Sequence, residues 1–153
     1  MATALEFDAW VRPHLPAMDR YAARLVEPGA VDDVVQEALV RAWRRHATFD
    51  PARGTPRAWL LAIVRDRARR HRIRRRTTPP VVSERGVRDA YRDLDLERAI
   101  LQLSRRQREL VDLYYFVGVD TPTCAAVLGC AEGTVRATLH QARARLRDLL
   151  GEG

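Results

Sequence analysis

The stretch GCAEGTVRATLHQARARLRDLL, residues 129–150, has the pattern of one amphipathic helix that begins just after a glycine. Its apolar residues recur at steps of three and four, as the buried face of a helix requires: Val135, Leu139, Ala142, Leu146, Leu149 and Leu150. Basic side chains line the neighbouring flank, and the opposite side holds small or uncharged residues, namely Gly133, Ala137, Gln141 and Ala144. Such a helix fits the major groove of DNA and equally fits an ordinary protein surface, so other parts of the chain must distinguish the two.

The basic residues are all arginine, and they are unevenly distributed. The chain has 27 of them against 20 acidic residues, which gives a net charge of +7 and a pI near 10.6. Residues 1–76 carry 16 arginines and 9 acidic residues, whereas residues 77–93 and 94–153 are each neutral. The excess positive charge therefore belongs to the first half, and it predicts a polyanionic partner for that half.

The sequence shows no membrane span, secretion signal or metal centre. No apolar run is long enough to cross a bilayer, and the N-terminus lacks a charged and then apolar signal pattern, so we expect a cytoplasmic protein without a membrane partner. Cys124 and Cys130 are six residues apart, which is not the spacing of a CxxC metal pair, and we interpret both as small core residues. The four histidines are scattered, and we expect no metal and no cofactor.

Helical periods run through the first half of the chain. We expect a first helix over about residues 7–25, interrupted near Pro13 and Pro16, and a second over about residues 31–46. The predicted inner face of the second helix is Val34, Val35, Ala38, Leu39, Ala42 and Trp43. Turn-forming residues predict a loop over residues 49–56.

A third predicted helix starts near Pro56 and changes character along its length. Its first part is apolar, and it continues without a helix breaker into RDRARRHRIRRR, residues 65–76, which contains eight arginines. An isolated charge run is typical of a solvated face or a disordered tail. Because this run continues a helix, its charges project from an ordered rod that is suited to neutralise phosphates.

The second half has the order of helices found in a helix-turn-helix. Prolines end the basic helix, and residues 77–93 are predicted to be a linker, so we expect an all-α fold of two small helical domains, residues 1–76 and 94–153. Ser104 begins an S-x-x-Q capping box, and the apolar side of the helix after it is Leu110, Val111, Leu113, Tyr114 and Val117. Thr121 followed by Pro122 predicts the N-cap of a short helix, and Gly129 turns the chain into the helix quoted first.

Four stretches together resemble the bacterial RNA polymerase sigma factors of the extracytoplasmic-function group. In the first half they are DDVVQEALVRAWRRHATFD, residues 32–50, and RAWLLAIVRDRARRHRIRRR, residues 57–76. In the second half they are LSRRQRELVDLYYFVG, residues 103–118, and LGCAEGTVRATLHQARARLRDLL, residues 128–150. The resemblance covers nearly the whole chain. It implies a promoter-specificity factor without enzymatic activity that binds core polymerase and recognises the −10 and −35 promoter elements.

The resemblance assigns a polymerase-binding role to the D-x-x-Q-E pattern, which falls on Asp33, Gln36 and Glu37. In this family that helix binds a coiled coil of the largest polymerase subunit. Asp33 and Glu37 are four residues apart and therefore share one helix face. The residues alone are also compatible with a solvated acidic face. A metal-dependent nuclease using Asp32, Asp33 and Glu37 is the alternative that we favour least.

The resemblance implies that the first domain binds the −10 element. In the family, the loop after the second helix captures a flipped base, and the basic helix holds the DNA backbone. On this sequence the loop spans residues 47–57, and the predicted DNA-binding residues are Arg53, Arg57, Arg65, Arg69 and Arg72. Phe49 and Trp59 could stack on bases, but we favour a place in the core for both.

The resemblance implies that the second domain binds the −35 element as duplex DNA. The predicted contacts lie on the last helix and are Arg136, His140, Gln141, Arg143 and Arg145. Arg136 suits guanine and Gln141 suits adenine, whereas Arg143 and Arg145 suit phosphates. The sequence departs from the family pattern in several places, so the promoter preference is open; these are Asp66, Arg70, Pro122, Thr123, Ala131, Thr138 and Gln141.

Partners and rival functions complete the expectations. The resemblance implies a regulatory anti-sigma factor as a further partner beside core RNA polymerase and promoter DNA. One rival function is a helix-turn-helix regulator that binds duplex DNA without polymerase, which leaves the Asp33, Gln36 and Glu37 face unexplained. Another is a sigma-like interaction protein that no longer reads promoters, which the altered positions Thr138 and Gln141 favour.

Overall fold

The computed structural model describes residues 3–75 and 94–151, and within these ranges it contains helices and no β-strand. The predicted all-α fold is therefore confirmed. The linker predicted for residues 77–93 lies outside the described residues. Among the described helices, none is long and apolar enough to cross a membrane.

The first half forms four helices. They are α1 (Ala4–Val11), α2 (Leu15–Leu25), α3 (Val31–Arg45) and α4 (Pro56–Arg75). The predicted interruption of the first helix is a 3-10 turn at Arg12–His14, which places Pro13 and Pro16 at the starts of helical segments, where a missing N–H costs no helical hydrogen bond. Thr3 and Glu6 form a capping box that begins α1.

The second half forms α6 (Leu94–Leu101), α7 (Arg105–Val111), a π-helical turn (Asp112–Val117), α8 (Thr121–Leu128) and α9 (Glu132–Leu149). The capping box predicted at Ser104 is present, with Gln107 as its second member. The N-cap of α8 is Asp120 rather than the predicted Thr121, because the Asp120 carboxylate accepts the backbone N–H of Thr123 at 2.9 Å. Thr121 is thereby left free to bond elsewhere.

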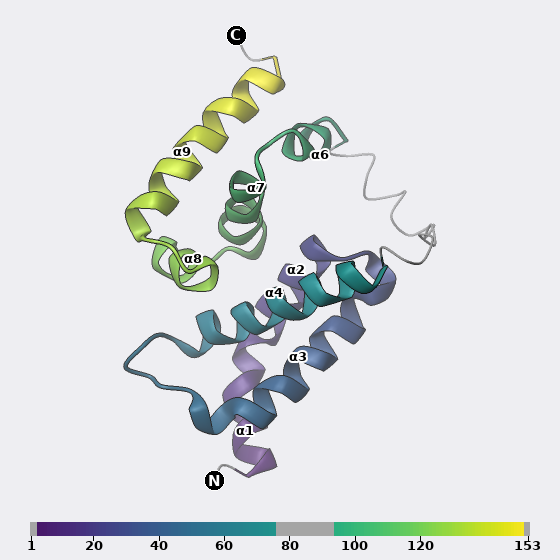
Figure 1. Ribbon diagram of the computed structural model, residues 1–153, viewed down its shortest axis with the longest axis vertical. Helices are drawn as coiled ribbons and strands as arrows, with labels where there is room; N and C mark the ends of the chain where they lie inside the picture. The colour runs from purple at the N-terminus through teal and green to yellow at the C-terminus, as the bar shows by residue number, and fades with distance from the viewer. Residues whose placement is uncertain (1–2, 76–93, 152–153) are drawn as a thin grey trace.

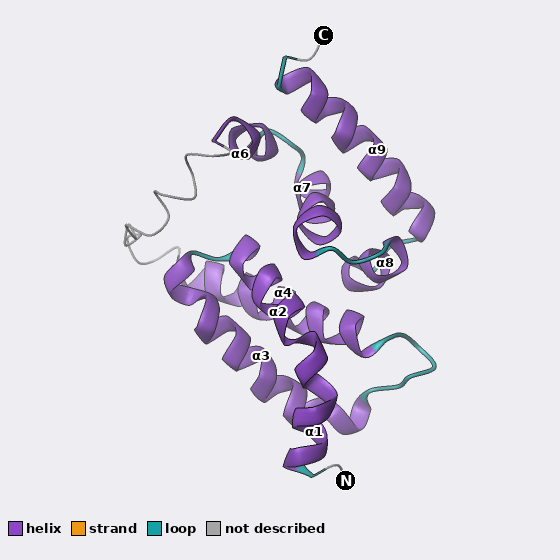
Figure 2. Ribbon diagram, turned by 180° about the vertical axis from the view of Figure 1, so that it is seen from behind, coloured by secondary structure: helices purple, strands orange, loops and turns teal. Residues whose placement is uncertain are grey.

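Helix α4 runs through the middle of the molecule (Figure 1). It packs against α2 and α3 on one side and against α8 on the other. Figure 2 shows the same arrangement from behind, with α9 on the outside of the second half and the N- and C-termini at opposite ends. The elements of the two halves therefore lie in direct contact.

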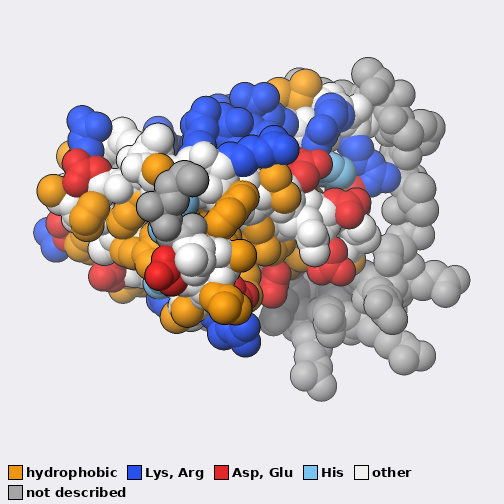
Figure 3. All heavy atoms as spheres, turned by 90° about the horizontal axis from the view of Figure 1, so that it is seen from below, with side chains coloured by type: hydrophobic (Ala, Val, Ile, Leu, Met, Phe, Trp, Pro, Cys, Tyr) orange, Lys and Arg blue, Asp and Glu red, His pale blue; other side chains and the backbone are white. Residues whose placement is uncertain are grey.

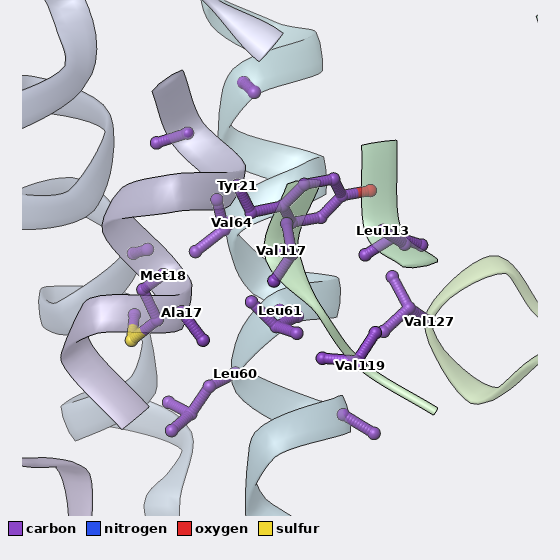
Figure 4. Close-up of a cluster of buried hydrophobic side chains, with 14 of the residues drawn as sticks. Ala17, Met18, Tyr21, Leu60, Leu61, Val64, Leu113, Val117, Val119 and Val127 are labelled. Atoms are coloured by element: carbon purple, nitrogen blue, oxygen red, sulfur yellow. The ribbon is translucent and has the colours of Figure 1, made fainter. Parts of the chain in front are cut away.

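The two halves share one hydrophobic core. Its fully buried members come from helices of both halves, and Tyr21, Leu61 and Leu113 are each 0% exposed. In Figure 4, Leu61 points from α4 toward Val117 and Val119, and the ring of Tyr21 extends toward Leu113. A smaller cluster, Ile100, Leu103, Val111 and Ala142, joins α6 and α7 to α9.

The helix-turn-helix consists of α8, the turn at Gly129 and α9. Gly129 has a φ of +68°, in the left-handed region that favours glycine, and it ends α8. Ala131 is the N-cap residue of α9 and provides no side-chain cap. Cys124 is a buried free thiol and Cys130 a half-buried one, in agreement with their interpretation as small residues of the core.

Three residues expected to be buried are exposed at the surface. Leu150, the last apolar position predicted for the buried face of α9, is 41% exposed and lies just beyond the end of that helix. Trp43 is 45% exposed, although the edge of its ring contacts Phe7 at a centroid distance of 5.2 Å. Tyr114 is 36% exposed. The chain at Asp112–Val117 is π-helical and has more residues per turn, so the α-helical spacing that placed Tyr114 on the apolar side does not apply there.

Candidate nucleic-acid interface

The three residues predicted to bind polymerase lie on one side of α3. Asp33 and Gln36 are exposed and Glu37 is half-buried. Glu37 accepts a hydrogen bond from the Arg74 guanidinium of α4 at 3.3 Å. Within residues 3–75 and 94–151, no three acidic, histidine or cysteine side chains are grouped as metal ligands.

The same side of α3 exposes apolar side chains that sequence reasoning missed. Val40 is 47% exposed and Trp43 is 45% exposed. Val40 also lines a shallow groove of about 330 Å³ together with Gln36 and Glu37. The signal was available in the spacing, since Gln36, Val40 and Trp43 follow one another at steps of four and three. A polar face with apolar side chains beside it is typical of a protein-binding surface.

The loop between α3 and α4 lines one side of an open cavity of about 290 Å³. Phe49 and Trp59 line it, and their ring centroids are 5.5 Å apart, with Trp10 packed behind both. Trp59 also packs against the core, as expected, whereas Phe49 contacts the rings of Trp10 and Trp59 and is not part of the core cluster. Both rings are half-buried and so reach the cavity as well. Arg53 lies at this cavity, and Ala126 of α8 contributes to its wall from the second half.

Side-chain hydrogen bonds hold both ends of this loop. The Asp50 carboxylate accepts the N–H of Ala52 at 2.9 Å, and the Thr55 hydroxyl accepts the N–H of Ala58 at 3.2 Å. These local bonds define a turn at the start of the loop and the first turn of α4. The loop beside the cavity is therefore held at both ends.

The predicted −10 arginines fall into two separate groups. Arg53 and Arg57 lie at the loop, where Arg57 donates a hydrogen bond to Nδ1 of His14 at 3.3 Å. Arg65, Arg69 and Arg72 instead line a cleft of about 920 Å³ between α4 and the second half. At 1.5 Å per residue, Arg72 is about 22 Å along the helix from Arg57. The first group belongs to the loop and the second to the cleft.

The cleft carries more positive than negative side chains. Arg65 donates to the Glu109 carboxylate at 2.8 Å, while Arg105 and Arg108 of α7 face the same space. Burial, and then the neighbouring charge of Arg105, lower the pKa of Arg72 from its ordinary value. An anion placed in the cleft would relieve this repulsion.

Arg24 of α2 joins the two halves. Its side chain enters a socket on the second half that is formed by Glu97, Asp112 and Phe116. Its guanidinium donates to Asp112 at 2.9 Å and to Glu97 at 2.8 Å, and it lies 3.7 Å from the centre of the Phe116 ring. Asp112 is buried at 8% exposure, and this burial raises the pKa of its carboxyl above the ordinary value. Arg20 adds a hydrogen bond at 3.0 Å to the backbone carbonyl of Val117. The π-helical turn supplies most of these partners, so it forms the contact site for α2.

On α9, the predicted −35 residues are all exposed: Arg136, His140, Gln141, Arg143 and Arg145. The spacing of Arg136, His140 and Arg143 places them on one flank, as predicted. Arg143 donates to the Tyr115 hydroxyl at 3.0 Å. Arg136 donates to the Glu132 carboxylate at 2.6 Å, and Glu132 is a residue that sequence reasoning had not singled out.

On one face of the molecule, many arginine side chains lie close together. Figure 3 shows the face seen from below, with arginine side chains in a band along one edge and apolar side chains over much of the remainder. A band of one sign next to an apolar area fits a polyanion on one side and a protein on the other.

Two family models match the chain. Residues 10–78 match the model described as sigma-70 region 2, and residues 93–146 match the model described as sigma-70, region 4. These matches lie on the two halves that the structure describes.

Similar proteins cover most of this chain. The ECF RNA polymerase sigma factor SigL of Mycobacterium tuberculosis is 35% identical over an alignment of 151 positions, which covers 91% of this chain and 85% of SigL. The RNA polymerase sigma-E factor of Streptomyces coelicolor is 34% identical over an alignment of 158 positions, which covers 98% of this chain and 89% of that factor.

Two solved structures have a similar overall arrangement. CnrH in complex with the cytosolic domain of CnrY gives a TM-score of 0.73 at 31% identity, over 97% of this chain and 90% of CnrH. The sigma factor RpoE of Bartonella quintana, in complex with the anti-sigma factor NepR, gives a TM-score of 0.70 at 29% identity, over 94% of this chain and 96% of RpoE.

Proposed function

The chain belongs to the extracytoplasmic-function sigma factors of bacterial RNA polymerase, and on this premise we propose which of its residues do the binding. It is a promoter-specificity factor: it binds core RNA polymerase, directs initiation at promoters with −10 and −35 elements, and is not itself an enzyme. A cytoplasmic location follows from that function and is part of the proposal.

Core polymerase binds the side of α3 that carries Asp33, Gln36 and Glu37. The exposed Val40 and Trp43 extend this surface and support the assignment, because apolar and aromatic residues dominate the centres of protein interfaces. Arg74 competes with the partner for Glu37, so docking replaces that exposed ion pair.

The loop cavity takes one flipped base of the −10 element. The observation that carries this assignment is the pair of aromatic rings, Phe49 and Trp59, in a cavity with an arginine beside it. Extruding a base costs about a few kcal/mol, which stacking on such rings offsets. Arg53 and Arg57 hold the backbone on either side of that base.

The DNA backbone next to the flipped base follows α4 and reaches Arg65, Arg69 and Arg72. These side chains line the cleft shared with α7, and Ala126 of α8 lies at the loop cavity, so the two halves separate when promoter DNA binds. The second half then binds the −35 element through α9, with Arg136 on a base edge and Arg143 and Arg145 on phosphates.

A regulatory anti-sigma protein acts on the arrangement in which the halves are in contact. The support for this partner is that the two solved relatives with a similar arrangement are complexes, one with CnrY and one with the anti-sigma factor NepR. Such a partner would keep the −10 arginines of α4 away from DNA.

The first experiment is transcription in vitro from a fragmented genomic library by core polymerase with and without this chain. We expect new start sites that share two spaced upstream elements. Core binding without new transcripts would instead favour a sigma-like interaction protein, and duplex binding without core binding would favour a plain helix-turn-helix regulator.

The second experiment tests the α4 arginines with the double variant Arg69→Ala, Arg72→Ala on a promoter so identified. Affinity falls as salt rises, and each phosphate contact adds about 0.9 to the steepness of log affinity against log salt. We therefore expect the double variant to make this dependence shallower by roughly 2. Arg98→Ala, an exposed arginine on α6, is the matched control. A slope unchanged in the double variant would remove α4 from the −10 assignment.

A further inference from the structure

Glu132 occupies a position that links three parts of the helix-turn-helix. It is the first residue of α9, and its Oε1 atom accepts two hydrogen bonds. One comes from the Thr121 hydroxyl at the start of α8, at 2.9 Å, and the other from the Arg136 guanidinium at 2.6 Å. The side chain of Glu132 is 39% exposed and that of Arg136 is 68% exposed. The carboxylate is thus tied to α8 while the arginine remains open to a ligand.

This geometry restricts the otherwise flexible side chain of Arg136. Arginine has five N–H donors in a planar fork, and the bond to Glu132 engages one end of it while other donors stay available. Because Thr121 holds the carboxylate, Glu132 directs Arg136 from a fixed point instead of moving with it. The carboxylate also lies at the positive end of the α9 dipole, where Ala131 supplies no cap.

We propose that Glu132 is a positioning residue for −35 recognition, which keeps Arg136 on a base edge and off the phosphate backbone. The proposal rests on the proposed function, since it takes Arg136 as a reader of the −35 duplex. An unrestrained arginine close to DNA readily contacts phosphate, and a phosphate contact carries no sequence information. The arginine aimed by Glu132 reads guanine through O6 and N7.

The proposal has an unusual consequence for affinity. Glu132 adds a negative charge near the DNA backbone, and it withholds one cation from the phosphates. It therefore weakens binding to every duplex while it increases the preference for the correct one. A residue that only stabilised the fold would act on all sequences alike.

The test measures −35 selectivity in the complex of the full chain with core polymerase. Promoter duplexes carry all four base pairs at each −35 position, and binding is compared for the wild type, Glu132→Ala and Glu132→Gln. For Glu132→Ala we expect discrimination at one position to fall about tenfold and affinity for mismatched duplexes to rise. Gln keeps an acceptor oxygen for Thr121 without the charge, so Glu132→Gln should lie between the two.

Asp148→Ala is the matched control, because it changes the net charge equally from an exposed position near the far end of α9. Discrimination that stays unchanged in Glu132→Ala, or a loss of binding that is equal for all duplexes, would overturn the proposal. Arg136→Ala separates the two levels of inference. If it lowers discrimination while Glu132→Ala does not, the positioning role alone is wrong; if neither does, the assignment of Arg136 as a −35 reader fails with it.

Discussion

Helices α4 and α9 both carry regularly spaced arginines, yet the fold uses them differently. On α4, Arg65 and Arg72 face the cleft shared with α7, and the same helix contributes Leu61 and Val64 to the core. On α9, Arg136 lies at the surface, with its side chain 68% exposed. A basic helix in the middle of a fold is both a structural element and a binding surface, whereas a basic helix at its edge is free to bind.

The ion pairs made by the arginines of α4 and α9 differ in the same way. Arginines of α4 pair with acidic residues from distant parts of the chain, Arg65 with Glu109 of α7 and Arg75 with Glu27. Arg136 on α9 pairs within its own helix. DNA that binds α4 must therefore replace long-range contacts, and one of them, Arg65 with Glu109, also joins the halves. DNA that binds α9 meets a side chain that is held only within its own helix. The three predictions below test the α4 side of this contrast, namely its packing in the core and the contact between the two halves.

The largest effect is expected where α4 acts as core. Leu61→Ala removes a fully buried side chain that points toward Val117 and Val119, and it should lower the free energy of unfolding by about 2–5 kcal/mol. Urea denaturation measures the loss. Leu5→Ala, at a position 83% exposed on α1, is the control and should change little. Equal effects of the two variants would contradict the shared core.

A smaller effect is expected from the Arg24 socket. Arg24→Ala leaves the buried Asp112 carboxylate without its partner and should cost about 1–3 kcal/mol; the more exposed Glu97 contributes little of this. The same variant should raise the affinity of the free chain for promoter DNA, because the halves separate more easily. Arg12→Ala removes an exposed ion pair with Asp8 and serves as the control. Weaker DNA binding by Arg24→Ala would argue against separation of the halves.

The smallest effect concerns the acid within the basic run. A hydrogen bond from Arg67 at 2.7 Å lowers the pKa of Asp66 below its ordinary value of 3.8. Asp66 therefore contributes stability above pH 3.8, and this contribution is lost as pH falls through its lowered pKa. The stability difference between the wild type and Asp66→Asn should accordingly be present near neutral pH and shrink below pH 3.8.

The contribution of Asp112 to stability changes with pH in the opposite direction. Burial raises its pKa, so its own contribution to stability falls as pH rises from 3.8 through the raised value. Thermal unfolding of Asp66→Asn and Asp112→Asn across acidic pH should therefore give opposite trends relative to the wild type. Parallel trends would show that the two carboxyls do not occupy the different environments described.

Local patterns predicted the helices well and some boundaries less well. The cap at Ser104 was predicted correctly because a capping box involves residues only three apart. The N-cap of α8 was placed one residue late, at Thr121 instead of Asp120, because both residues are suitable caps and Pro122 allows either register. Tyr114 was wrongly assigned to the apolar side of its helix, because the spacing of the residues does not predict a π-helical turn.

In the candidate sites, too, local features were predicted and long-range contacts were not. Arg136, His140 and Arg143 of α9 were predicted onto one flank, which follows from helical spacing alone. The separation of Arg53 and Arg57 from the cleft arginines, and the role of Glu132, were not foreseen. They depend on which distant residues meet: His14 with Arg57, Glu109 with Arg65, and Thr121 with Glu132.

The sequence by itself determined the all-α class, the helix-turn-helix, the excess of positive charge in the first half and the family resemblance, because each depends on composition, on residues a few positions apart or on patterns along the chain. Only the tertiary structure decided that the halves share a core, that Arg24 enters a socket on the second half, and that part of the basic helix faces a cleft. Such contacts join residues far apart in sequence, and they depend on how complete helices pack, which no local pattern encodes.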